Sequence, residues 1–411
     1  MGEDPHPVLK HKTILLVIPN LGIGGAQKVF LDQYAFYSKS FNTIGCVFNW
    51  DGVPVEDRQN FIISLNVAAG GNILEKALSF IRRVIILRRL KSENKVDISI
   101  SHLEGADYIN ILSKGREKVV CWIHGSKRFD RNIKGLQGYL RKQWIIPLLY
   151  RRVDQIVTVS KAIRKEVAQL TGLPVTRIAT LHNGFALDNI ERNALVKITK
   201  FEELAEAHFL IIVHCRLSKE KNLQALLRIF SLLQAPAIGI KLVILGDGEL
   251  RTDLEDICQV LGLSSYRAWS EMPWHHDYEV YFMGFQRNPF PYLRSAALYA
   301  MTSLNEGFPL SLCEAMACGV PVISSDCHTG PREILAPELE TPVPVLKPFV
   351  SSYGILMPVP DSSERYTLWS DYILGLIADK LTLETLGKQG KTRIQDFNIR
   401  INEEKWLQFL S

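Results

Sequence analysis

Two glutamates, Glu306 and Glu314, are separated by the seven residues GFPLSLC, which are mostly small or apolar. An unpaired carboxylate is expensive to bury, so the pair has two interpretations. Both acids border a cleft and contact a polar ligand, or Glu306 is an ordinary loop acid and Glu314 lies on a solvated helix face. The flanking residues SLC and AMACG leave that helix little polar surface, which favours the ligand.

A basic pair lies upstream in HCRLSKEKNL, where Lys221 follows Arg216 by five residues. A guanidinium forks onto phosphate oxygens and a lysine adds a mobile point charge, so together they suit a pyrophosphate. The alternative is a solvated helix start with unrelated charges.

Glycines follow several of the apolar runs. Gly24 and Gly25 lie in PNLGIGGAQKV, Gly246 in LGDGEL and Gly284 in VYFMGF. Glycine lets backbone approach a phosphate or a flat base. The first group lacks the GxGxxG spacing of dinucleotide-binding proteins, and each glycine alone is also compatible with tight packing.

The segment that carries the glutamates predicts a strand, a loop, a helix and a strand. The helix is expected to start near Pro309 or Leu310 and to end with Gly319 as its C-cap. The free N–H groups at its start can bind an anion. Glu314, two turns in, could then reach a ribose hydroxyl, and Glu306 in the loop would meet the sugar beyond the pyrophosphate.

Short apolar runs alternate with longer amphipathic ones, the first of them a helix at 26–38. Strands are predicted at 12–20, 96–101, 118–125, 155–160, 209–216, 240–248, 279–285, 298–303 and 320–326. Strands that alternate with helices imply parallel sheets, and two such sets imply two doubly wound, Rossmann-like α/β domains. Ligands of such folds bind beyond the carboxyl ends of the strands.

The charge distribution also divides the chain. Residues 1–200 hold 30 Lys and Arg against 17 Asp and Glu, whereas the remainder holds 18 against 26. The change coincides with a polar segment at 185–205, which we expect to be the domain boundary. The basic half could face nucleic acid, an anionic membrane or a phosphorylated substrate. Nucleic acid is disfavoured because no recognised nucleic-acid-binding motif is present.

Composition places the protein among ordinary soluble globular proteins, with 47% apolar and 22% charged residues. Its seven cysteines show no CxxC spacing, which suits a reducing compartment and argues against a structural zinc site. The N-terminal stretch MGEDPHPVLKHK lacks the apolar core of a signal peptide. No apolar run approaches the roughly 20 residues of a membrane span, so a cytoplasmic location is expected.

NEGFPLSLCEAMACGVPVISSDCHTGPREI resembles the signature of the family-4 retaining glycosyltransferases, which have the GT-B fold of two Rossmann-like domains with a cleft between them. The resemblance extends to PNLGIGGAQKV, RRVDQIVTVSKAIRKEV, LHNGFAL, RLSKEKN and SYGILMPVPD. It implies an acceptor-side domain at 1–190, a donor-binding domain at 205–385 and a helix at 386–411 that crosses back to the first domain. DCHTGPREIL is most similar to members that build bacterial surface polysaccharides and lipid-linked oligosaccharides.

By this resemblance, Gly24 and Gly25 would approach the donor phosphate and the acceptor. Arg216 and Lys221 would neutralise the departing diphosphate, where negative charge grows in the transition state. Glu314 would bind the ribose, and Glu306 would hold hydroxyls of the transferred sugar.

The resemblance assigns two further groups, and the strand-end glycines add a third. The backbone of Phe308, Pro309, Leu310 and Ser311 would line the phosphates and the sugar. Gly246 and Gly284 would adjoin the base of the nucleotide. His124, at the end of KVVCWIHG, would face the C6 hydroxyl of the sugar, although a lone histidine can also be structural. Front-face return, with the leaving phosphate assisting the acceptor, is the implied mechanism.

Two features depart from the family pattern. Cys215 replaces the usual glycine before the arginine, so the backbone approach there is in doubt. The segment 264–280 is longer and more aromatic than usual and contains the adjacent pair His275 and His276. Such a pair without matching ligands is more often a surface feature than a metal site. The family implies neither metal nor other cofactor.

The basic first half predicts a partner of its own. In 77–95, Leu78, Ile81, Ile85 and Leu90 lie broadly along one helical face with arginines around it. A basic amphipathic helix can lie on an anionic membrane, or it can simply have a solvated basic face. The basic segment 126–144 could meet an acceptor phosphate. Peripheral membrane attachment and a lipid-linked saccharide acceptor are therefore expected.

The sequence therefore predicts a retaining transferase that moves a hexose or N-acetylhexosamine from a nucleotide-sugar, with UDP favoured over GDP-mannose. A subunit that binds a nucleotide-sugar without turnover and a sugar-nucleotide epimerase are the alternatives. The sugar, the base, the acceptor, the linkage and the oligomeric state stay open.

Overall fold

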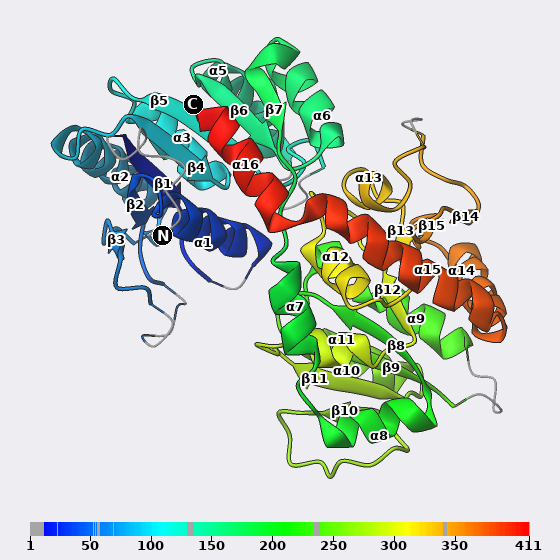
Figure 1. The fold of residues 1–411 in the computed structure, drawn as a ribbon. Coiled ribbons are helices and arrows are strands. Elements are labelled where there is room, and N and C mark those ends of the chain that lie inside the picture. Colours follow the sequence, from blue (N-terminus) through cyan, green and yellow to red (C-terminus); the bar gives the residue numbers. More distant parts are fainter. Residues whose placement is uncertain are drawn as a thin grey trace, which may run out of the picture. The chain divides into compact units, whose positions relative to one another are not determined.

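The computed structural model describes residues 12–410, apart from residues 23, 52, 54, 56–57, 69, 130–134, 234–238 and 340–342. The chain divides into two compact units, Met1–His182 and Asn183–Ser411. Each unit contains its own largely parallel sheet with helices packed on it (Figure 1). The predicted fold class of two doubly wound α/β domains is confirmed.

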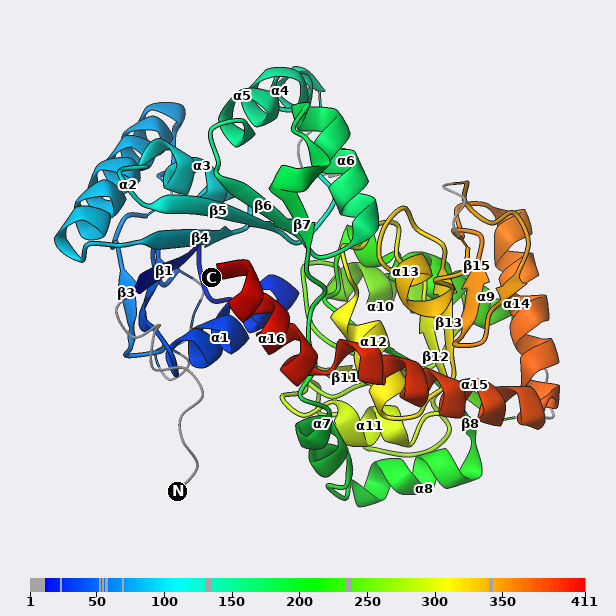
Figure 2. The ribbon, with the colours of Figure 1, turned by 45° about the horizontal axis from the view of Figure 1, so that its top comes forward.

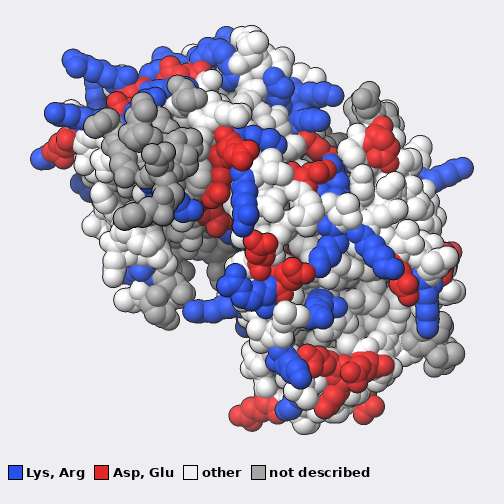
Figure 3. Space-filling model, in the orientation of Figure 1, with Lys and Arg blue, Asp and Glu red and all other residues white. Residues whose placement is uncertain are grey.

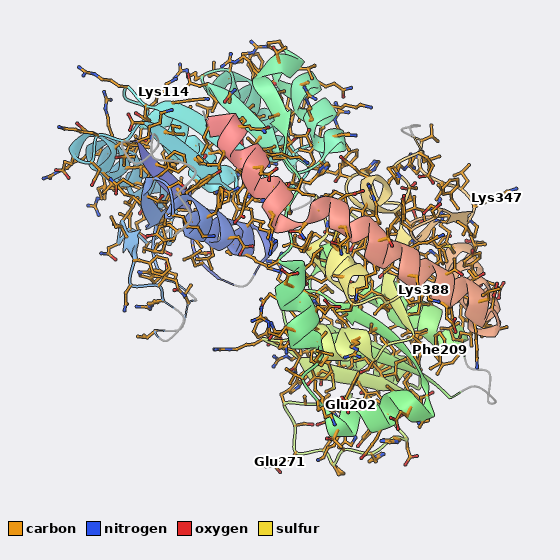
Figure 4. The ribbon with its side chains drawn as sticks, in the orientation of Figure 1. Lys114, Glu202, Phe209, Glu271, Lys347 and Lys388 are labelled. Carbon is orange, nitrogen blue, oxygen red and sulfur yellow. The ribbon has the colours of Figure 1, made fainter. Side chains whose placement is uncertain are left out.

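The first unit is built on a seven-stranded parallel sheet. In spatial order its strands are β3 (Ile62–Ser64), β2 (Asn42–Val47), β1 (Thr13–Ile18), β4 (Ile98–His102), β5 (Lys118–Ile123), β6 (Gln155–Thr158) and β7 (Ile178–Thr180). All six residues of β1 are buried, as expected of a central strand that is covered on both faces. Lys114, which is labelled in Figure 4 and precedes β5, is paired at 2.7 Å with Asp154, which precedes β6.

Helices cover both faces of this sheet. They are α1 (Gly25–Tyr37), α2 (Ile73–Glu93), α3 (Glu104–Leu112), α4 (Gly135–Leu140), α5 (Ile146–Tyr150) and α6 (Lys161–Thr171), with a π-helical turn at Arg141–Ile145 and a 3-10 turn at Val175–Arg177. Figure 2 shows α2 and α3 on one face of the sheet and α1 on the other. One apolar core, which includes Leu15, Leu87 and Ile109, joins the sheet to α2 and α3.

The second unit is built on an eight-stranded sheet. Its order is β10 (Ser265–Arg267), β11 (Val280–Gly284), β9 (Ile240–Leu245), β8 (Phe209–His214), β12 (Leu298–Met301), β13 (Val322–Ser325), β15 (Ile355–Met357) and β14 (Phe349–Val350). Only β14 runs antiparallel to its neighbour. Since β8 and β12 are parallel neighbours, the loops that follow them leave the same edge of the sheet.

The helices of the second unit follow the same alternation. They are α7 (Leu187–Ala194), α8 (Thr199–Ala207), α9 (Leu223–Leu232), α10 (Arg251–Val260), α11 (Phe290–Arg294), α12 (Leu310–Ala317), α13 (Pro331–Leu335), α14 (Ser363–Ala378), α15 (Lys380–Arg393) and α16 (Ile399–Leu410), with 3-10 turns at Lys219–Lys221 and Ile394–Phe397. Helices α7 and α8 occupy most of the polar segment 185–205. The predicted passage of the C-terminal segment to the first domain stays a prediction.

Helix α2 exposes an apolar stripe. Leu74, Leu78, Ile81 and Ile85 repeat at alternating spacings of four and three residues, and between 48% and 70% of each residue is exposed. Leu90, which the sequence placed on this face, is half-buried. It is five residues beyond Ile85, and at 3.6 residues per turn that step turns it away from the stripe. Figure 3 shows Lys and Arg side chains at the edge of the first unit where α2 lies.

A capping box fixes the start of α2. The Asn72 side chain accepts a hydrogen bond from the Glu75 backbone N–H at 2.8 Å, and the Glu75 carboxylate accepts from the backbone N–H of Asn72. Within the part of the chain that the structure describes, no helix combines the length and the apolar composition that crossing a membrane requires.

Candidate active site

The second unit brings the predicted acidic and basic residues to one edge of its sheet. Arg216 follows β8 and is exposed, and Lys221 ends the next 3-10 turn. Glu306 lies in the loop after β12. The backbone N–H of Leu304 donates to the Glu220 carbonyl at 2.8 Å, which ties the two loops together. The sequence prediction that these residues lie at the carboxyl ends of strands is confirmed.

Lys221 and Glu306 form an ion pair. The Lys221 Nζ to Glu306 Oε1 distance is 2.7 Å, and the Ser303 hydroxyl donates to the same oxygen at 2.7 Å. Glu306 is only 9% exposed. Burial lowers the pKa of Lys221, but the Glu306 carboxylate outweighs this effect and the pKa is raised. The carboxylate is thus buried at little cost because two donors satisfy it.

Glu314 is also buried, with 6% of the residue exposed. It lies in α12, which begins at Leu310, and Gly319 follows the helix with φ of 78°, as predicted for its C-cap. Glu314 Oε2 lies 3.5 Å from His214 Nδ1. Both glutamates are therefore held among polar partners rather than on a solvated helix face.

A tyrosine on the neighbouring strand β12 positions the first turn of α12. The Tyr299 hydroxyl on β12 donates to the Ser311 hydroxyl at 2.9 Å, and burial raises the Tyr299 pKa well above its usual range. Phe308, next to the helix start, is buried and packs edge-to-face on Phe397 with ring centroids 5.1 Å apart. The predicted phosphate-facing segment 308–311 is therefore fixed by side-chain contacts on both sides.

The loop after β13, which contains Thr329 and Gly330, packs against the loop that carries Glu306. The Thr329 hydroxyl donates to the Glu306 carbonyl, and Gly330 has φ of 92°. A Cβ on Gly330 would lie 2.7 Å from Pro309 Cδ and 3.0 Å from the Gly307 carbonyl oxygen. The TGPRE stretch thus needs glycine at this position because it packs against the loop that carries Glu306.

Gly246 lies too close to the backbone of Cys215 to carry a side chain. It has φ of 137°, its N–H donates to the Gly284 carbonyl at 2.8 Å, and a Cβ there would lie 1.8 Å from the Cys215 carbonyl oxygen. Gly284 has φ of 68°. The two glycines predicted beside the base are therefore adjacent. Cys215, at the departure from the family pattern, is hydrogen-bonded by its N–H to Leu245, and burial raises its thiol pKa to about 12.

His124 follows β5 in the first unit and is paired with a second histidine. Its Nε2 lies 2.8 Å from Nδ1 of His102, which ends β4 and is fully buried. Burial and the Lys127 ammonium lower the pKa of His124 to about 3, and burial and His124 lower the pKa of His102 well below its usual value. Both rings are therefore neutral near pH 7, so one ring donates to the other.

The glycine loop of the first unit precedes α1. Gly24 is the N-cap of this helix, and its φ of 174° is extended backbone that any residue adopts. A Cβ on Gly24 would meet the end of the Gln27 side chain at 2.5 Å. Gly25 is the first residue of α1. The predicted contacts of these glycines and of His124 with a ligand held by the other unit stay predictions.

A buried charge cluster supports the edge that carries His124. Lys127 Nζ lies 3.1 Å from Glu104 Oε2 and 3.8 Å from Asp107 Oδ2, and Arg141 also pairs with Glu104. Burial raises the Asp107 pKa to about 6, whereas the cations outweigh burial at Glu104 and lower its pKa to about 2. Leu103, just before the cluster, has a left-handed φ of 71°. The sequence analysis missed this cluster because its members come from three separate segments: α3, the loop with Lys127 and the π-helical turn with Arg141.

Sequence reasoning also missed His102, His214, Ser303 and Tyr299. Each lies at or near a strand end next to a predicted residue, which is the signal that could have revealed it. Among the residues that the structure describes, no group of three or more His, Cys, Asp and Glu side chains could hold a metal ion. His275 Nδ1 lies 3.4 Å from Asp277 Oδ2, and His276 packs near the His208 ring.

Comparisons with known proteins agree with this geometry. Residues 23–189 match the family model described as Glycosyltransferase Family 4, and residues 208–353 match the one described as Glycosyl transferases group 1. The chain is 26% identical over 390 residues to the N-acetylgalactosamine-N,N'-diacetylbacillosaminyl-diphospho-undecaprenol 4-alpha-N-acetylgalactosaminyltransferase of Campylobacter jejuni, covering 93% of this chain and 95% of the relative.

Two further similarities bear on the family and the fold. The lipopolysaccharide 1,6-galactosyltransferase of Salmonella typhimurium is 26% identical over 196 residues, which is 46% of this chain and 48% of that protein. The crystal structure of HepE from Anabaena in complex with UDP and glucose superposes with a TM-score of 0.73 at 18% identity, covering 97% of this chain and 99% of that chain. The two family models together span both units, and the chain belongs to the group 1, family 4 glycosyltransferases with the GT-B fold.

Proposed function

We propose that this glycosyltransferase moves a hexose or N-acetylhexosamine from a UDP-sugar to a lipid-linked saccharide acceptor in polysaccharide or glycan assembly. The observation that carries the proposal is the Lys221–Glu306 pair beside the exposed Arg216 and the start of α12. The pair places a cation and an acid side by side at the sheet edge. An arriving diphosphate would take over the Lys221 ammonium and leave Glu306 free to accept sugar hydroxyls.

The chemistry follows from where charge develops. As the bond between the sugar C1 and the phosphate oxygen breaks, negative charge grows on the diphosphate, and Arg216, Lys221 and the N–H groups of Leu310 and Ser311 stabilise it. The acceptor oxygen forms its bond to C1 on the same face, and its proton passes to the leaving phosphate oxygen. The anomeric configuration is then retained. These cations supply the neutralisation for which other transferases use a metal, so we propose that none is required.

The relatives support the donor and the acceptor class. The Campylobacter relative is named for a diphospho-undecaprenol substrate, the Salmonella relative for lipopolysaccharide, and the Anabaena structure holds UDP and glucose. Transferred to this chain, these names favour UDP and a lipid-pyrophosphate acceptor. The apolar stripe of α2, with exposed Arg82, Arg88 and Arg89 beside it, would then rest on an anionic membrane surface at the inner face of the cytoplasmic membrane.

Thermal-shift binding against UDP, GDP, ADP and their common sugars tests the donor site. A ligand that binds only the folded state adds about 2.7 kcal/mol at 100 times its Kd, so UDP should raise the unfolding temperature. If only GDP raises the unfolding temperature, the proposed UDP-sugar donor is wrong and a GDP-mannose-type donor takes its place. No shift with any nucleotide would contradict the diphosphate site.

Turnover separates the transferase from a binding subunit. With the donor that binds, proton NMR of the product should show the anomeric configuration of the donor, and excess EDTA should leave the rate unchanged. An inverted product would contradict the front-face mechanism, and loss of activity in EDTA would contradict the metal-free proposal.

A further inference from the structure

A cavity of about 700 Å³ lies in the first unit, and its wall contains none of the residues assigned above. Its wall includes Asn49, Trp50, Asp51, Arg58 and Asn66. The first four belong to the connection between β2 and β3, and Asn66 follows β3. The cavity therefore opens at the carboxyl edge of the sheet, where ligands of doubly wound folds bind.

Trp50 gives the cavity its apolar surface. The side chain is half-buried, yet it makes no hydrogen bond and no ring contact with any residue that the structure describes. A tryptophan that is withdrawn from water usually finds a partner for its N–H and packs its ring. Trp50 therefore brings to this wall a ring that can stack and an N–H that can donate to a ligand.

The polar groups of the cavity are held by backbone contacts. Asn49 donates through Nδ2 to the Val67 carbonyl at 3.3 Å and accepts through Oδ1 from the Asp51 N–H at 3.2 Å. Arg58 Nε donates to the Val53 carbonyl at 3.3 Å. These bonds use only part of the capacity of each side chain, so the remaining donors and acceptors can serve a ligand in a fixed geometry.

The combination of groups selects a chemical class. An aromatic face, two amides, one carboxylate and one guanidinium line the cavity. A flat apolar face with several hydrogen-bonding groups around its rim matches a pyranose ring, which has an apolar C–H face and equatorial hydroxyls. Asp51 and Arg58 bring opposite charges to the wall, and the polar rim disfavours a lipid tail.

The cavity is tied to the glycine loop but not to the strand that carries His124. The Phe48 N–H, at the start of the connection, donates to the Pro19 carbonyl at 3.1 Å, where PNLGIGG begins. In the sheet, β2 is three strands from β5, which ends before His124. At about 4.8 Å per strand the two lie about 14 Å apart along the edge. A sugar in the cavity would therefore not be the one that His124 faces.

We propose that this cavity is an acceptor subsite, which stacks a pyranose ring of the acceptor glycan on Trp50, away from the reacting hydroxyl. The inference rests on the proposed function, since it assigns the saccharide acceptor a place in the first unit. It makes the enzyme sensitive to the length of the acceptor glycan and to the identity of an inner sugar.

Saturation-transfer NMR with methyl glycosides of glucose, galactose, N-acetylglucosamine and N-acetylgalactosamine, and with triacetylchitotriose, tests the subsite. At least one of these probes should bind the wild-type protein, and Trp50→Ala should weaken that binding at least fivefold. Trp50→Phe should restore part of it because an aromatic face remains. Phe61→Ala is the matched control: Phe61 lies in the same connection and is 49% exposed, but it is not part of the wall.

The outcomes are distinct. Equal binding by wild type and Trp50→Ala, equal loss in Phe61→Ala, or no binding of any probe at tens of millimolar would overturn the subsite. The thermal shift with UDP, measured on the same samples, reports the donor site of the other unit. Glycoside binding without a nucleotide shift would refute the proposed donor and leave the subsite standing, and the reverse would refute the subsite alone.

Turnover supplies a second readout. With acceptors that differ by one inner sugar, wild-type enzyme should prefer the longer one, and Trp50→Ala should abolish that preference by raising the KM for the longer acceptor. An unchanged preference in Trp50→Ala would also overturn the subsite.

Discussion

At the residue scale, Lys221 and Lys219 offer a matched comparison. They share one 3-10 turn, but only Lys221 is paired with Glu306, whereas Lys219 is exposed. Lys221→Ala should lower kcat/KM about 10²–10³-fold, because it removes a preorganised cation from the leaving group. Lys219→Ala should stay within about threefold of wild type.

Both variants are measured for kcat/KM in the transferase assay and for the rise in unfolding temperature that UDP causes. Loss of activity in both variants to the same extent would show that general positive charge, rather than the position of Lys221, matters. Glu306→Gln should retain part of the UDP shift, since Lys221 keeps its diphosphate role when the acid is neutral.

His102 and His124 predict how stability depends on pH. Both have folded pKa values below the ordinary histidine value of about 6.5, so the unfolded chain takes up protons there first. Above pH ~6.5 these histidines are neutral in both the folded and the unfolded chain, and folding is not penalised. As the pH falls from about 6.5 towards their folded-state pKa values, the unfolded chain binds protons that the folded protein does not, so the free energy of unfolding decreases. Each group should cost up to about 1.4 kcal/mol per pH unit in this range.

The variant His102→Asn removes one of these groups. Its unfolding temperature should fall less steeply than that of wild type between pH 6.5 and 5, while both slopes agree above pH 7.5. Parallel slopes at the lower pH would mean that His102 is protonated in the folded protein. The 2.8 Å contact would then need a charged donor.

At the element scale, the packing of the loop after β9 against the loop after β8 requires glycine at position 246. Gly246→Ala places a Cβ 1.8 Å from the Cys215 carbonyl oxygen at a φ of 137°. The change should destabilise the protein by about 2–4 kcal/mol, since both sterics and backbone conformation oppose it. Denaturant unfolding monitored by circular dichroism measures the loss.

Gly375→Ala is the control for this substitution. Gly375 lies inside the exposed part of α14, and nothing lies within 4 Å of a Cβ built there. Alanine should stabilise the helix by about 0.5–1 kcal/mol. Destabilisation by both variants would indicate that each glycine is needed for a reason other than close approach.

At the scale of the whole molecule, charge separates the two ends of the chain. The net charge is +5, but residues 1–200 alone carry an excess of 13 basic residues. Together with the apolar stripe of α2, this excess predicts binding to vesicles with anionic lipid, weakened by salt, and none to vesicles of neutral lipid. Co-sedimentation measures the bound fraction.

The double variant Ile81→Asp/Ile85→Asp should lose at least tenfold in vesicle affinity. Val260→Asp, at an 83% exposed position in the second unit, adds one negative charge outside α2 and should bind like wild type. Light scattering of the protein without vesicles tests whether a second copy of the chain, rather than a membrane, covers the stripe. If the double variant breaks a dimer and leaves vesicle binding intact, the stripe is an interface between copies.

The sequence by itself determined where most of the longer strands lie along the chain, and at which strand ends the candidate site residues lie. Buried strands such as β1 and β8 are continuous apolar runs, and β-loop-helix boundaries carry glycine and capping signals, so both are local properties. The spacing from Glu306 to Glu314 likewise lies within one loop and helix. Six strands were not predicted: β2, β3, β7, β10, β14 and β15. Five of them have only two or three residues, which carry no period of their own. The sixth, β2, has the sequence NTIGCV, whose polar start and internal glycine hide its apolar pattern.

Only the tertiary structure decided which of these residues meet. Lys221 and Glu306 are 85 residues apart, and His102 and His124 are joined because β4 and β5 are neighbours in the sheet. The Trp50 cavity arises where two connections leave one sheet edge, and the solvent-facing stripe of α2 depends on which side of the helix covers the core. Strand order and register set these contacts over long sequence separations, and no local pattern encodes them.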